Sequence, residues 1–105
     1  MTDHLTISRK LALAIGWKPE QMRFYDGELW IERRHRLHGL LRPFDYRNEL
    51  IAFRVAERFD AFPTKLYDGT KWVNRAYGAP RPKDVAAATP QLAIALAVIA
   101  AQGVK

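Results

Sequence analysis

Residues 25–33 read Tyr-Asp-Gly-Glu-Leu-Trp-Ile-Glu-Arg, and residues 67–75 return to that pattern as Tyr-Asp-Gly-Thr-Lys-Trp-Val-Asn-Arg. Tyr, Asp, Gly, Trp and Arg coincide in the two stretches. Each Asp-Gly pair supplies the two positions of positive φ that a tight two-residue turn requires, so the sequence predicts two antiparallel hairpins. The expected strands are residues 22–25 with 28–33, and residues 64–67 with 70–77.

Side chains alternate across a strand, which places Leu29, Ile31 and Arg33 on one face of the first hairpin and Trp30 and Glu32 on the other. Apolar side chains on both faces are typical of a sheet that helices cover on both sides. The likeness of the two stretches has two explanations. They are copies of one repeated unit, or they are two hairpins that each contain a favourable turn and a favourable aromatic residue.

Three helices are expected around the hairpins. Residues 3–15 carry apolar side chains at helical spacing and are followed by Gly16, which tolerates a left-handed cap. Residues 46–60 carry a second apolar stripe, with Asp45 as the expected N-cap. Residues 89–101 begin with Thr-Pro, a favoured helix start, and are apolar on all sides, as in deeply buried helices.

This order of elements predicts a single α+β domain over residues 1–105. The expected architecture is an α/β/α sandwich of order α-ββ-α-ββ-α, with a mainly antiparallel sheet and helices on both of its faces. A further short strand is expected near residues 37–41. With 49% hydrophobic and 27% charged residues, the composition is that of a globular protein rather than a disordered one.

Few residues suit catalysis or metal binding. The chain has no cysteine, which favours a reducing cytoplasm, and its one serine, Ser8, falls inside the first expected helix. Glu32, His35 and His38 are spaced three apart, but the arginines among them oppose a cation, so we expect exposed loop histidines and no metal. No Gly-rich phosphate loop is present, and we expect no enzyme activity and no cofactor.

The N-terminal residues do not form a basic stretch followed by an apolar run, so no signal peptide is expected. The longest apolar run, residues 92–101, is about half of the ~20 residues that a membrane span needs. We therefore expect no membrane association.

The formal net charge is +6, and basic residues cluster in and after the first hairpin. If the two hairpins lie side by side in one sheet, their arginines and lysines would converge and fork onto phosphate or carboxylate groups. Alternatively, these side chains only keep the rim of the sheet solvated. The expected binding residues are Arg33, Arg34, Arg36, Arg42, Lys71 and Arg75.

Four segments together resemble the phage ABA-sandwich domain family: residues 14–18, 44–45, 72–73 and, above all, 88–97. The resemblance covers nearly the whole chain, although Ala95 stands where the family often has a cysteine. It implies a sheet between helical layers and a phage or prophage origin. It brings no catalytic residues.

Together, the resemblance and the charge favour a phage accessory protein that acts without catalysis in the host bacterial cytoplasm. Its expected partner is a host macromolecule, and anti-defence inhibition, such as anti-CRISPR activity, is one instance. The alternative is a basic nucleic-acid-binding module, whose affinity would fall steeply with salt. A third possibility is a homo-oligomer that pairs through an exposed sheet edge.

Overall fold

The computed structural model describes residues 3–35, 38–65, 72–75 and 84–103. Side chains are described for all of these except residues 34, 35, 38, 40, 64, 65, 72–75 and 84–86. The elements are α1 (His4–Ala14), a short 3-10 helix η1 (Pro19–Gln21), β1 (Met22–Tyr25), β2 (Glu28–His35), β3 (His38–Pro43), α2 (Glu49–Phe59), β4 (Thr64–Lys65), β5 (Trp72–Arg75), β6 (Asp84–Ala87) and α3 (Pro90–Ala101). The protein is therefore a mixed α and β fold with antiparallel strands, as expected.

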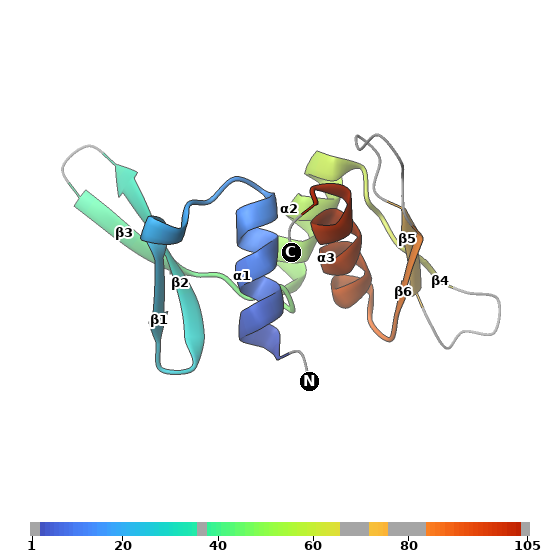
Figure 1. The fold of residues 1–105 in the computed structure, drawn as a ribbon, viewed down its shortest axis with the longest axis horizontal. Helices are drawn as coiled ribbons and strands as arrows, with labels where there is room; N and C mark the ends of the chain where they lie inside the picture. The colour runs from blue at the N-terminus through green and yellow to red at the C-terminus, as the bar shows by residue number, and fades with distance from the viewer. Residues whose placement is uncertain (1–2, 36–37, 66–71, 76–83, 104–105) are drawn as a thin grey trace.

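The described strands form two separate three-stranded sheets, sheet A with the order β1-β2-β3 and sheet B with the order β4-β5-β6. Figure 1 shows them at opposite ends of the molecule with the three helices between them. The expected single sheet between two helical layers is thus wrong, because the helices lie between two separate sheets. Each hairpin completes its sheet with the strand that follows it in the chain, rather than with the other hairpin.

Local signals in the sequence explain the first half of the fold. The Asp3 carboxylate accepts a hydrogen bond of 2.8 Å from the Thr6 backbone N–H and so begins α1. Gly16 follows the helix at φ +109°, a conformation that favours glycine. Asp26 and Gly27, at φ 55° and 74°, form the expected turn between β1 and β2. The second expected turn, at residues 68–69, lies outside the described residues.

The second and third helices lie close to their expected positions, with one correction. The N-cap of α2 is Asn48, whose side-chain oxygen accepts from the Leu50 and Ile51 N–H groups, and not Asp45. Thr89 caps α3 as expected, with its hydroxyl accepting from the Leu92 N–H at 3.2 Å.

One hydrophobic core joins sheet A to all three helices. Leu11 of α1, Ile31 of β2, Val55 of α2 and Val98 of α3 are buried in the same cluster. The helix α3 packs against α1, α2 and sheet B, and small buried side chains such as Ala95 allow these close approaches. In the described part of the chain, every helix is too short or too polar to cross a membrane.

The two halves of the chain share one plan. Each consists of three antiparallel strands followed by a helix, β1-β2-β3-α2 and β4-β5-β6-α3. Arg23 pairs with Trp30 across β1 and β2, and Lys65 pairs with Trp72 across β4 and β5. The sequence separation between Arg23 and Lys65 equals that between Trp30 and Trp72, so the two hairpins have the same register. The likeness seen in the sequence therefore extends to strand pairing and to the order of elements.

Candidate binding groove

A groove of about 870 Å³ lies between the helix-facing side of sheet A and α2, and residues of the segment that follows α1 also line it. We call it the arginine groove. Its lining residues are Ile15, Gly16, Trp17, Ile31, Arg33, Arg42, Pro43, Phe44, Asn48, Leu50, Ile51, Arg54, Val55 and Arg58.

The floor of the arginine groove is apolar. Ile31, Phe44 and Val55 are buried members of the core, and Ile51 packs partly buried against them. Leu50 instead leaves 59% of its surface exposed. The groove therefore combines a floor fixed by the core with apolar surface that a ligand could cover.

Two arginines enter the groove from sheet A. Ile31 pairs directly with Arg42 across β2 and β3, so the two side chains lie on the same face of the sheet. Arg33 is two residues beyond Ile31 on β2 and shares that face. The alternation expected for this hairpin is confirmed over residues 29–32, since Leu29 and Ile31 are buried while Trp30 and Glu32 are only partly buried.

Two further arginines enter from α2. Leu50, Arg54 and Arg58 follow one another at intervals of four residues, so they form a single row along the helix. All three line the groove and are exposed. Sequence reasoning missed Arg54 and Arg58, since they were indistinguishable from a solvated helix surface until α2 was placed opposite β3.

Two of the four guanidinium groups are held in place by the protein. Arg58 donates from Nη1 to the Ile15 carbonyl at 2.8 Å. Arg33 lies over the Trp17 ring, 5.0 Å from its centroid. These contacts fix the arginine side chains before any ligand arrives, which reduces the entropy that binding must overcome.

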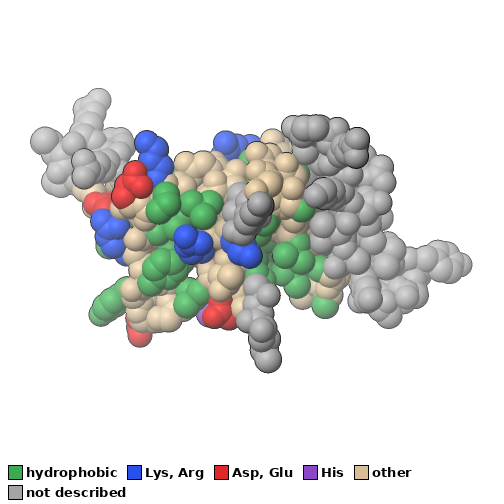
Figure 2. Space-filling model, viewed as in Figure 1, with side chains coloured by type: hydrophobic (Ala, Val, Ile, Leu, Met, Phe, Trp, Pro, Cys, Tyr) green, Lys and Arg blue, Asp and Glu red, His purple; other side chains and the backbone are tan. Residues whose placement is uncertain are grey.

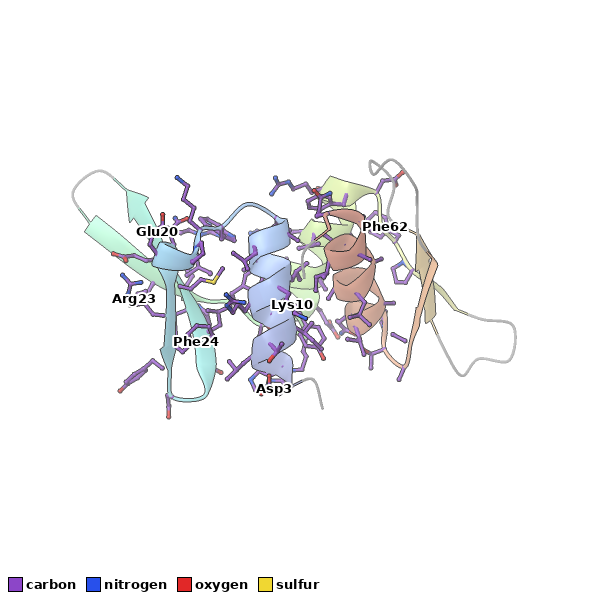
Figure 3. The ribbon with its side chains drawn as sticks, in the orientation of Figure 1. Asp3, Lys10, Glu20, Arg23, Phe24 and Phe62 are labelled. Atoms are coloured by element: carbon purple, nitrogen blue, oxygen red, sulfur yellow. The ribbon has the colours of Figure 1, made fainter. Side chains whose placement is uncertain are left out.

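The charges of the groove are not neutralised within the described part of the protein. The ion pairs there join Arg23 to Glu32 at 3.0 Å and Arg47 to Asp45 at 2.7 Å, and neither pair belongs to the groove. Arg23, labelled in Figure 3, lies on the opposite face of sheet A from Ile31. Among the described lining residues there are four arginines and no carboxylate, so the groove is suited to an anionic ligand.

The structure divides the expected binding residues. Arg33 and Arg42 lie together in the groove. The side chains of Arg34 and Arg75, and all of Arg36 and Lys71, lie outside what is described. The convergence was expected only if the two hairpins lay side by side in one sheet, and this condition is not met, because β2 and β5 belong to sheets at opposite ends of the molecule. On the face drawn in Figure 2, lysine and arginine side chains are spread among apolar ones rather than gathered in one patch.

The described groups with shifted pKa values are Asp3, Asp45 and Arg47, and none of them lines the groove. The Asp3 carboxylate accepts hydrogen bonds from Thr6 at the start of α1, which lowers its pKa. Hydrogen bonds from the Arg47 guanidinium lower the pKa of Asp45, and the same contact raises the pKa of Arg47.

The described residues hold no group of three histidine, aspartate or glutamate side chains that could bind a metal ion. Of the three residues spaced three apart in the sequence, Glu32, His35 and His38, the two histidine side chains lie outside the described set. The backbone places His35 at the end of β2 and His38 at the start of β3, rather than in the expected loop.

No family model, no curated protein and no solved structure matches the chain.

Proposed function

We propose that the protein acts without catalysis, as a binding module that docks an acidic segment of a partner protein in the arginine groove. The observation that carries this proposal is the set of four arginines, without a lining carboxylate among the described residues, around an apolar floor. Guanidinium groups fork onto carboxylates, and the apolar floor gains free energy when a partner's apolar side chains cover it.

The composition of the floor favours a protein over a nucleic acid. Sequence-tolerant binding of single strands depends on exposed aromatic rings on which bases stack. In the groove, Arg33 already covers a face of Trp17, Phe44 is buried, and the remaining floor is mainly aliphatic. Aliphatic surface matches leucine-like side chains better than bases.

The test uses fluorescein-labelled peptides of glutamate and leucine, and oligo(dT) as the nucleic-acid probe, in fluorescence anisotropy. We expect the peptides to bind the wild-type protein. The single variants Arg42→Glu and Arg54→Glu should each weaken peptide binding at least tenfold, because a hydrogen bond to a charged group contributes about 1.5–3 kcal/mol. Arg9→Glu is the matched control, since Arg9 is exposed on α1 and does not line the groove.

Equal weakening by Arg9→Glu would show that overall charge, not the groove, drives binding, and would overturn the proposal. Tighter binding of oligo(dT) than of the peptides, with a steep dependence on salt, would instead support the nucleic-acid-binding alternative. Thermal melting followed by circular dichroism checks that each variant is folded. The phage origin implied by the family resemblance stays a prediction, and so does the anti-defence role that the resemblance and the charge together favour.

A further inference from the structure

The second half of the chain provides a template for the occupant of the arginine groove. In that half, α3 packs directly against both β5 and β6 of sheet B. By the shared plan, β2 and β3 are the counterparts of β5 and β6, and α2 is the counterpart of α3. In this half of the chain, the helix thus lies on the second and third strands of its own sheet.

In the first half the corresponding place is only partly filled. The helix packed on sheet A is α1, through its contacts with β2, whereas α2 packs against α3. The groove lies in the space that remains, with Arg42 and Pro43 of β3 on one side and α2 on the other. A helix that covered β3 would lie along this space.

The length of the connection between the third strand and the helix explains why α3 lies on its own sheet and α2 does not. Residues 88–89 alone join β6 to α3, whereas residues 44–48 join β3 to α2. The longer connection is anchored at two points. The Phe44 N–H donates to the Leu29 carbonyl at 2.8 Å, and the Tyr46 N–H donates to the fully buried Ser8 hydroxyl at 3.0 Å. These bonds hold α2 away from β3 and leave the groove preformed.

The arginines are placed to receive a helix with acidic flanks. Arg33 and Arg42 project from the sheet, and Arg54 and Arg58 project from α2, so cations stand on both sides of the apolar floor. The row from Leu50 to Arg58 extends about 12 Å along α2, or roughly two helical turns. An amphipathic helix with an apolar stripe and glutamates on either side matches this arrangement.

We infer that the arginine groove accepts an acidic amphipathic α-helix of a partner protein, lying between α2 and β3 as α3 lies on sheet B. This inference rests on the proposed function and specifies the conformation of the partner. Because β3 is the edge strand of sheet A that borders the groove, an extended segment that pairs with β3 is the competing arrangement.

Two labelled peptides of identical composition separate these arrangements. In one, leucines recur at i, i+3, i+4 and i+7 among glutamates, and in the other leucine and glutamate alternate. A third peptide carries a central proline in the helical sequence. We expect the helical peptide to bind at least about tenfold more tightly than the other two and to gain helicity on binding, measured by anisotropy and circular dichroism.

Variants on α2 localise the contact. Leu50 and Phe53 are exposed to similar extents, 59% and 53%, but only Leu50 lines the groove. Leu50→Glu should therefore abolish the preference for the helical peptide, while Phe53→Glu should preserve it. Melting temperatures report whether both variants remain folded.

The outcomes distinguish this inference from the proposed function. Equal binding of the three peptides, sensitive to Arg42 and Arg54, would overturn the helical occupant and leave the acidic-segment proposal intact. Preference for the alternating peptide would overturn it in favour of strand addition at β3. Absence of binding by all three peptides would overturn both.

Discussion

Asp45 and Arg47 form an ion pair at the entry to α2, beside the arginine groove. Arg47 donates to the Asp45 carboxylate from its backbone N–H at 2.9 Å and from its guanidinium at 2.7–3.2 Å. The pair stiffens the connection that determines where α2 lies. Because 57% of the Arg47 side chain and 28% of the Asp45 side chain are exposed, the pair stabilises the fold only modestly.

We expect Asp45→Asn to lower the free energy of unfolding by up to about 1 kcal/mol near neutral pH. The pKa of Asp45 is lower in the folded than in the unfolded chain, so its stabilisation is present above the ordinary value of about 3.9 and is lost as pH falls through the folded value. Urea denaturation of wild type and variant at pH 7, 5, 4 and 3 measures this. A difference that grows towards acidic pH would contradict the assignment.

Single residues also mark where sequence reasoning stops. Asp45 and Asn48 both have side chains that cap helices, and the sequence does not show which one stands where the chain turns into α2. In the structure the Asp45 carboxylate accepts hydrogen bonds from Arg47, and the side chain of Asn48 caps α2 instead. Arg54 and Arg58 became site residues only through the placement of α2, which depends on contacts between distant segments.

Among the elements, α3 depends most on small side chains. Ala95 is fully buried where α3 lies among the other helices and sheet B. We expect Ala95→Leu to destabilise the fold by about 1–3 kcal/mol, because a close-packed core has no room for the added carbons. Ala100→Leu, at a half-buried position of the same helix, is the control and should cost less. Chemical denaturation measures both, and an equal effect would argue against close packing at Ala95.

The sequence predicted the helices and the β1–β2 hairpin well because their signals are local. Caps, turns and apolar periodicity act within a few residues, as the positive φ of Asp26 and Gly27 illustrates. The strand β6 was missed because Asp-Val-Ala-Ala contains a single residue that favours strands. Pairing with β5, rather than local preference, makes this segment a strand.

At the scale of the whole molecule, the two sheets stand at opposite ends of the helical centre and lengthen the protein. Its extents are 49 × 30 × 23 Å, and its radius of gyration is 14.1 Å. A compact domain of this length has a radius of gyration of about 13 Å. Apolar side chains on both faces of the hairpins had suggested helices on either side. Local alternation cannot specify which distant segment covers which face, so the sequence misplaced the layers.

Because one core joins sheet A to all three helices, we expect the protein to unfold in a single cooperative transition. Urea transitions followed by far-ultraviolet circular dichroism and by tryptophan fluorescence should coincide. Two separated transitions would show that the halves unfold independently and would argue against the single domain expected for residues 1–105.

The connections at residues 44–48 and 88–89 differ in length, and the helices that follow them pack differently in the two halves of the chain. In the half with the short connection, α3 lies on its own sheet and is buried in the core, which stabilises the fold. In the half with the long connection, α2 packs against α3 rather than on its own sheet, and Leu50 stays exposed to solvent. Exposed apolar surface of this kind lowers stability and is typical of binding surfaces. In this fold, the length of the chain between the third strand and the helix therefore decides whether the helix lies on its own sheet or leaves a groove beside it.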